Sequence, residues 1–271
     1  MTGPAADPAT GRAVAVDARG PADSPVLVLL HGTRRTRAMW GPQLRDLSDT
    51  FRVLAVDLPG HGTLADVPFR LADASAMVGS VIDDAGGRAI VIGQSLGAYV
   101  GLDLAAGRPS RVAGLVLANA SAEPRSIARR APRTVGSYLL AAAGERVRGV
   151  ATSAEPAPAA DAGATKGGGA VPATNGWLFK GGMRAMVAAL GETFIPRLAA
   201  YPGPTLLVNG EEDHLFRHGE RAFLAAAMDG RLEVIPGCGH LVSEEQPAAF
   251  NAAVRRFAAE VYGADATRAG S

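Results

Sequence analysis

Short apolar runs alternate with longer helical patterns along most of the chain, and this alternation limits the possible folds more than any other feature. Seven runs rich in Val, Ile and Leu lie between glycines and prolines and have the length of β-strands. They are Arg12–Asp17, Val26–Leu30, Arg52–Asp57, Ala89–Ile92, Val112–Ala118, Thr205–Asn209 and Leu232–Ile235. Most are continuously apolar, as strands are when helices cover both faces of a parallel sheet. The sequence therefore predicts an α/β fold with a mostly parallel central sheet.

The stretches between these runs show the spacing of amphipathic helices. They are Arg37–Leu47, Leu71–Asp84, Ser95–Ala106, Arg217–Met228 and Gln246–Tyr262. The last of them places four large apolar residues on one face, so we expect it to pack on the sheet. We expect Ala264–Ser271 to be a frayed tail.

The alternation stops between residues 121 and 199, where no convincing strand is found. We predict a core made of residues 1–120 and 200–271, with a helical insertion between them. Helical patterns occur at residues 135–148 and 177–190 of the insertion. Residues 151–175 consist mostly of Ala, Gly and Pro, and we expect this segment to be mobile because it offers little to bury.

Composition excludes several classes of protein. Lys and Arg number 27 against 26 Asp and Glu, so the net charge of +1 predicts neither a nucleic-acid nor a membrane-surface partner. The single cysteine, Cys238, cannot form an internal disulfide, and no close-set Cys or His cluster predicts a metal site. The polar N-terminus does not resemble a signal peptide, and no apolar run could span a bilayer. We therefore expect a cytoplasmic protein.

Gly93-Gln94-Ser95-Leu96-Gly97 matches the G-x-S-x-G pattern of a nucleophile elbow. The pattern alone is weak in a chain with 34 glycines, but here a predicted strand leads into it and a helical pattern follows at once. A serine on such a sharp strand-to-helix turn is held clear of the backbone at the carboxyl edge of the sheet. Ser95 is therefore the predicted nucleophile.

An acid and then a base should follow the nucleophile, each just after a later strand. His240 lies on a glycine-bounded loop after the last predicted strand, and an imidazole suits a general base. The strand that ends at Asn209 is followed by three adjacent acidic residues, Glu211, Glu212 and Asp213. Only one can face the imidazole; we choose Asp213 because it lies furthest past the strand, with Glu212 as the alternative.

The loop after Val26–Leu30 supplies the last expected element, an oxyanion hole. We assign its two donors to the backbone N–H groups of Thr33 and Leu96. His31 more plausibly braces this loop through hydrogen bonds than takes part in chemistry. Arg34 and Arg35 follow Thr33, and either could pair with a carboxylate or phosphate of a substrate or be a solvated surface charge.

Together these motifs resemble the α/β-hydrolase superfamily, in its esterase-like branch with a helical cap. The resemblance covers residues 12–262 and rests on the HGT loop, the DLPGHG turn, the GQSLG elbow, the GEED segment and the GCGH loop, in family order. It implies the same roles for Ser95, Asp213 and His240, and a cap, formed by the insertion, over the acyl pocket. A serine at position 95 argues against the branches that use a carboxylate nucleophile.

We therefore expect a serine hydrolase that cleaves a small or medium carboxylic ester through an acyl-enzyme, with no cofactor and no metal. A thioesterase, lactonase or C–C hydrolase would share every residue named, and a ligand-binding protein of this fold with little turnover is the alternative from another class. In the insertion, Trp177 and Met183, with Phe179 and Met186, are candidates to line the pocket, although packing within the cap would explain them as well. The oligomeric state cannot be read from the sequence.

Overall fold

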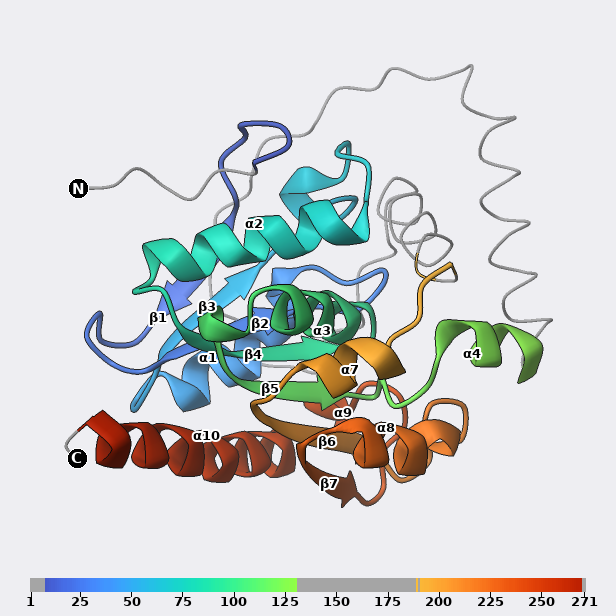
Figure 1. The fold of residues 1–271 in the computed structure, drawn as a ribbon. Coiled ribbons are helices and arrows are strands. Elements are labelled where there is room, and N and C mark those ends of the chain that lie inside the picture. Colours follow the sequence, from blue (N-terminus) through green and yellow to red (C-terminus); the bar gives the residue numbers. More distant parts are fainter. Residues whose placement is uncertain (1–7, 131–188, 190, 270–271) are drawn as a thin grey trace, which may run out of the picture.

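A seven-stranded sheet forms the centre of the computed structural model, which describes residues 8–130, 189 and 191–269 (Figure 1). The strand order is β1-β3-β2-β4-β5-β6-β7. The strands are β1 Val16–Arg19, β2 Val26–Leu30, β3 Arg52–Val56, β4 Ala89–Gln94, β5 Val112–Ala118, β6 Pro204–Gly210 and β7 Asp229–Ile235. β2 to β7 are parallel and β1 pairs antiparallel with β3. The predicted α/β class with a mostly parallel sheet is confirmed.

Helices lie on both faces of this sheet (Figure 1). The α-helices are α1 Gly41–Leu47, α2 Leu71–Asp84, α3 Leu96–Gly107, α4 Pro124–Arg130, α7 Ile195–Ala200, α8 Glu220–Ala226, α9 Val242–Glu245 and α10 Pro247–Ala269. Short 3-10 helices are η1 Arg37–Trp40, η2 Gly62–Leu64, η3 Pro109–Arg111 and η4 Arg217–Gly219. Among the described residues no helix is both long and apolar enough to cross a membrane.

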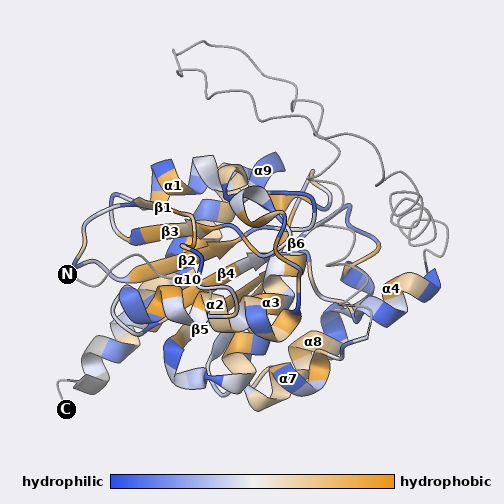
Figure 2. Cartoon of the chain, turned by 90° about the horizontal axis from the view of Figure 1, so that it is seen from above, coloured by the Kyte–Doolittle hydropathy of each residue, from blue (hydrophilic) through white to orange (hydrophobic). Residues whose placement is uncertain are grey.

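The continuous apolar strands divide their side chains between two cores. In β2, Val28 and Leu30 join the core under α2, α3, α7 and α8, whereas Leu27 and Leu29 join the core under α1, α9 and α10. β4 and β5 alternate in the same way, because successive side chains of a strand point to opposite faces. Figure 2 shows the consequence: the central strands are largely hydrophobic, and the surrounding helices carry both hydrophobic and hydrophilic residues.

The largest differences from the predicted boundaries lie near the two ends of the chain. The first strand is Val16–Arg19 rather than Arg12–Asp17, because this edge strand is fixed by its ladder with β3 and exposes most of its side chains, so apolar pattern does not mark it. Residues 264–269 of the predicted frayed tail belong to α10, which continues to Ala269. An ion pair between Arg88 and Asp265 at 2.6 Å holds this last part of the helix against the chain.

Two helices lie in the described part of the range predicted for the insertion. α4 begins it, and α7 lies at its end, where the buried Phe194 and Leu198 join the core and Phe194 stacks on Tyr99 of α3 at 4.3 Å between ring centroids. The carboxylate of Glu123 accepts the backbone N–H groups of Phe194 and Ile195, which ties the start of this range to its end. The helices predicted at 135–148 and 177–190, except residue 189, and the segment 151–175 lie outside the described residues. The division into core and cap stays a prediction.

Candidate active site

β4 ends in a sharp turn that carries Ser95. The backbone of Ser95 has φ 53° and ψ −113°, a conformation that L-residues rarely adopt, and α3 begins at the next residue. Strained backbone of this kind concentrates at functional sites, where the surrounding structure holds it in place. The first N–H groups of a helix have no acceptor within the helix, so the Leu96 N–H lies at the positive end of α3.

The two glycines of the pattern are required by close backbone contacts. A Cβ at Gly93 would lie 2.3 Å from the Ala98 nitrogen, where α3 folds back over the end of β4. A Cβ at Gly97 would lie 2.2 Å from the carbonyl oxygen of Leu30, the last residue of β2. Neither position has room for a side chain, which is why the pattern has a glycine at both positions around Ser95.

Asp213 and His240 come together at the carboxyl edge of the sheet, from the loops after β6 and β7. Nδ1 of His240 lies 2.8 Å from Oδ2 of Asp213. Burial acts to raise the pKa of Asp213, but hydrogen bonds from His240, the Asn119 amide and the Phe216 N–H lower it below its usual range. An ionised carboxylate only accepts, so Nδ1 of His240 carries the proton of this hydrogen bond.

Burial distinguishes the three adjacent acidic residues from one another. The Asp213 side chain is 4% exposed, whereas Glu211 and Glu212 are exposed residues. Their backbone N–H groups donate instead to Ile235 and Cys238, at 2.9 Å each, and so join the acid loop to the histidine loop. Of the three candidates, Asp213 is the one whose carboxylate bonds the imidazole.

His240 is held by contacts on several sides. The ring of Phe216 stacks on the imidazole with centroids 4.4 Å apart. The carboxylate of Glu245 accepts the N–H groups of Gly239 and Leu241, the two neighbours of His240, at 2.8 Å each. The imidazole itself stays 38% exposed. The loop is therefore fixed while the ring remains open to a ligand.

Gln94 connects the histidine loop to the elbow. Its Nε2 donates to the carbonyl of His240 at 2.6 Å, and its Oε1 accepts the hydroxyl of Ser243 at 3.2 Å. Because Gln94 directly precedes Ser95, these bonds hold the serine and the histidine at the same part of the sheet edge.

The loop after β2 runs beside the elbow. The carbonyl of Gly32 accepts the N–H of Arg35 at 3.1 Å, which makes a tight turn with Thr33 and Arg34 at its corners. A Cβ at Gly32 would lie 3.5 Å from the Cβ of Ser95, so the turn lies close beside the serine. Thr33 is half-buried in this turn.

His31 stabilises the turn through hydrogen bonds, as predicted from the sequence. Its Nδ1 donates to the Gly32 carbonyl at 2.9 Å and its Nε2 accepts the N–H of Leu58 at 3.0 Å. Burial, followed by the nearby ring of His61, lowers the pKa of His31 to about 3. The ring is therefore neutral in solution near pH 7 and serves the turn rather than proton transfer.

Comparison with known proteins identifies the family. Residues 27–253 match the model of the Alpha/beta hydrolase family. This chain belongs to the alpha/beta hydrolase family. It is 32% identical over 255 residues, 90% of this chain and 96% of the relative, to a Variovorax paradoxus protein named "Putative carbamate hydrolase RutD". It is 27% identical, over 87% of this chain and 95% of the relative, to the pimeloyl-[acyl-carrier protein] methyl ester esterase of Nitrosospira multiformis.

A solved structure supports the same family assignment. A hydrolase from Pseudomonas aeruginosa superposes with a TM-score of 0.66 and 28% identity, over 90% of this chain and 93% of the other. The protein is a hydrolase of this fold.

Arg34 and Arg35 are the predicted substrate-contact candidates of this hydrolase that the structure describes. Arg34 is half-buried, next to Thr33, with φ 64° in the left-handed region. Arg35 is paired: its Nε and Nη2 lie 3.1 and 3.2 Å from the two carboxylate oxygens of Glu244 in α9. The pocket candidates of the insertion, Trp177, Phe179, Met183 and Met186, lie outside the described residues.

Sequence reasoning missed several residues around this hydrolase's imidazole: Gln94, Asn119, Phe216, Ser243 and Glu245. One of them had a usable signal, because Asn119 is a polar residue directly after the buried strand β5 and so must lie at the edge that carries the site. Phe216 had none, since nothing in a single sequence places an aromatic ring on a histidine from another loop.

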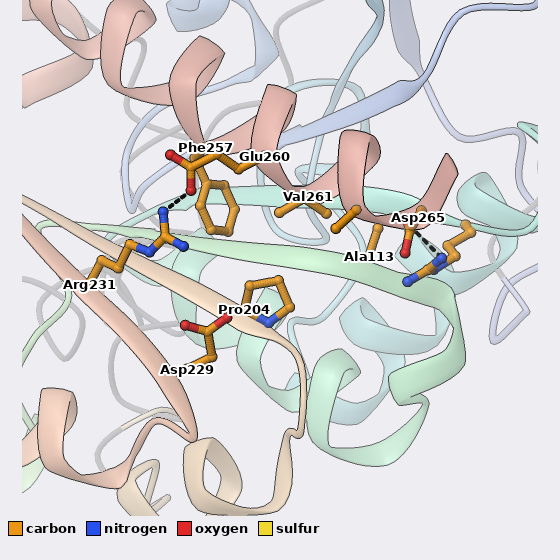
Figure 3. Close-up of a pocket in the computed structure, with 10 residues that line it drawn as sticks. Ala113, Pro204, Asp229, Arg231, Phe257, Glu260, Val261 and Asp265 are labelled. Carbon is orange, nitrogen blue, oxygen red and sulfur yellow. Dashed lines mark hydrogen bonds and ion pairs between the residues drawn. The ribbon is translucent and has the colours of Figure 1, made fainter. Parts of the chain in front are cut away.

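A separate pocket of about 140 Å³ lies at the opposite edge of the sheet, beside α10 (Figure 3). Its apolar floor includes Phe257 and Val261, and Arg231 and Glu260 form an ion pair at its rim. The lining residues of β5, β6 and β7 are at the amino ends of these strands, away from Ser95. This pocket is therefore no part of the site described above.

Proposed function

We propose that this hydrolase cleaves small or medium carboxylic esters through an acyl-enzyme on Ser95. The observation that carries the proposal is the hydrogen bond between His240 Nδ1 and Asp213 Oδ2, at the sheet edge where Ser95 sits in a strained turn. A neutral imidazole with its Nδ1 proton held by an ionised carboxylate is the form of histidine that accepts a proton at Nε2. The methyl ester esterase among its relatives supports an ester as the substrate.

In the first step, Ser95 Oγ attacks the ester carbonyl carbon and its proton passes to His240 Nε2. The carbonyl oxygen becomes an oxyanion, for which the N–H groups of Leu96 and Thr33 are the proposed donors. When the tetrahedral intermediate collapses, the bond to the alkoxy group breaks and His240 returns the proton to the leaving alcohol. Asp213 stays ionised and stabilises the imidazolium throughout.

In the second step, water attacks the acyl-enzyme while His240 accepts one of its protons. Collapse releases the carboxylic acid and returns the proton to Ser95 Oγ. The reaction consumes one water and uses only groups of this chain and the substrate.

For the substrate itself we propose a contact with Arg34, whose turn carries Thr33. A guanidinium there could pair with a remote carboxylate of the acyl chain. Arg34→Ala should then raise the KM of an ester bearing such a carboxylate and leave a neutral ester of equal size unchanged. Trp177 and Met183 stay candidates for the acyl pocket, and a cytoplasmic location stays a prediction.

A fluorophosphonate probe tests the nucleophile directly. The wild-type protein should be labelled on the peptide that contains Ser95, and Ser95→Ala should lose the label. Ser80→Ala is the matched control, because the Ser80 hydroxyl lies in α2 and bonds the Ala76 carbonyl. An unlabelled wild-type protein would instead favour a ligand-binding role.

A substrate panel then separates ester hydrolysis from its neighbours. Esters, thioesters, lactones and a C–C substrate should be compared by kcat/KM on the wild-type protein, with Ser95→Ala as the blank. The highest kcat/KM is expected for an acyclic ester. If a thioester, a lactone or a C–C substrate has the highest kcat/KM, the proposed nucleophile stands and the proposed substrate class is wrong.

A further inference from the structure

Asn119 occupies the centre of the hydrogen bonds behind the histidine and is used by none of the steps above. It follows β5 directly, its side chain is fully buried, and its φ of 48° lies in the left-handed region. Asn is one of the few residues other than Gly that tolerate this conformation. Position 119 therefore requires a residue that tolerates a left-handed backbone and whose side chain can be buried.

The side-chain amide touches three parts of the site. Its Nδ2 donates to Asp213 Oδ2 at 2.8 Å and to the Gly239 carbonyl at 3.2 Å. Its Oδ1 accepts the Val242 N–H and the Gln94 Nε2, both at 3.4 Å. One amide group thus bonds the acid, both flanks of the histidine loop, and the residue before the elbow serine.

The bond to Asp213 has a specific chemical consequence. Oδ2 is the same oxygen that accepts the Nδ1 proton of His240, and Oδ1 accepts the Phe216 N–H at 3.3 Å. A buried carboxylate needs such donors to stay ionised, and their directions fix how the carboxylate is turned. Without the amide, Oδ2 keeps one donor and the carboxylate can rotate away from the imidazole.

We propose that Asn119 is a positioning residue that turns the Asp213 carboxylate toward His240 and holds the histidine loop to the elbow. Its effect on turnover rests on the function proposed for Ser95, whereas its effect on the Asp213–His240 hydrogen bond does not. The competing explanation is that Asn119 is present only because the backbone needs a left-handed residue, and glycine would then serve equally well.

Substitution by glycine and by alanine separates the two explanations. Asn119→Gly keeps the backbone conformation and removes the amide, while Asn119→Ala removes the amide and adds left-handed strain. We expect both to lower kcat by about 10- to 100-fold, the size expected for losing a hydrogen bond to a charged group, with little change in KM. Only Asn119→Ala should also be destabilised by left-handed backbone strain.

Asn251→Ala is the matched control. Asn251 is also a buried asparagine, but its amide bonds Gln43 and Asp46 on the α1 and α10 side of the sheet. This variant should lose melting temperature and keep kcat. A drop in kcat for Asn119→Gly no greater than that of Asn251→Ala would show a merely structural role and overturn the proposal.

Proton NMR gives a readout that does not depend on turnover. The Nδ1 proton of His240, held by Asp213, should give a low-field resonance in the wild-type protein and in Ser95→Ala, and its absence from His240→Ala assigns it. We expect Asn119→Gly to shift this resonance upfield or broaden it beyond detection. An unchanged resonance with unchanged kcat in Asn119→Gly would refute the proposal, whereas full activity in Ser95→Ala would refute only the proposed nucleophile.

Discussion

Arg35 and Glu244 form a two-pronged ion pair that joins the turn after β2 to the helix after the catalytic candidate His240. Both side chains are 28% exposed, so the pair is neither fully solvated nor buried. It connects the loop that holds the proposed oxyanion donor Thr33 to the loop that holds the proposed base. The two loops lie 209 positions apart in the chain at these residues.

Removing either partner of this pair should lower kcat several-fold, because the oxyanion turn and the histidine loop lose a shared anchor. The stability change should be small, about 0–1 kcal/mol, because both side chains of the pair stay in partial contact with solvent. Arg35→Ala, Glu244→Ala and the double variant form a cycle, in which the double variant should be no slower than the slower single one. Arg111→Ala is the control, since Arg111 pairs two-pronged with Asp83 away from the site. Additive losses of kcat would contradict the coupling.

Asp213→Asn should lower turnover by about 10⁴, because it removes the charge that orients His240 and stabilises its imidazolium. Glu212→Gln should leave turnover nearly unchanged, because Glu212 is exposed and contributes its backbone N–H to the loop. Steady-state kinetics of the two variants decides between them. The reverse pattern would assign the acid to Glu212 and require a rearranged loop.

Gly97→Ala should destabilise the protein by about 1–3 kcal/mol, because the added Cβ meets the Leu30 carbonyl and the helix must move. Since the shift displaces the Leu96 N–H, kcat should also fall. Gly107→Ala, in the same helix but with nothing within 4 Å of the added Cβ, should leave both quantities nearly unchanged. Thermal unfolding and kinetics of the pair test the prediction, which fails if Gly97→Ala behaves like its control.

The neutral, buried His31 predicts a loss of stability in acid. Its pKa is about 3 in the folded protein and near 6.5 in the unfolded chain, so between these values unfolding takes up a proton. The contribution is fully present above pH 6.5 and is lost as the pH falls toward 3, at up to about 1.4 kcal/mol per pH unit. Urea unfolding from pH 7 to 4 should show a shallower pH dependence in His31→Gln. The exposed His214→Gln is the control and should follow the wild-type slope.

The sequence by itself determined the fold class and the chain order of the candidate groups. Apolar runs interrupted by helical patterns follow from local periodicity, and Gly93, Ser95 and Gly97 form a contiguous pattern that can be recognised without knowing that the Leu30 carbonyl of β2 excludes a side chain at Gly97. His240 could likewise be selected because a histidine that directly follows a glycine-rich turn after the last strand has a recognisable local setting.

Only the tertiary structure decided what surrounds these groups. Asn119, Phe216 and Glu245 come from three separate segments of the chain, and their contacts with Asp213 and the histidine loop depend on strand order and on the direction of each strand. The choice of Asp213 over its neighbours likewise became a geometric fact only when burial and the hydrogen bond to His240 were known. The local sequence pattern indicates which residues have the chemistry for catalysis. Long-range packing determines which of these residues contact one another, because contacts between distant segments leave no periodic signal in a single sequence.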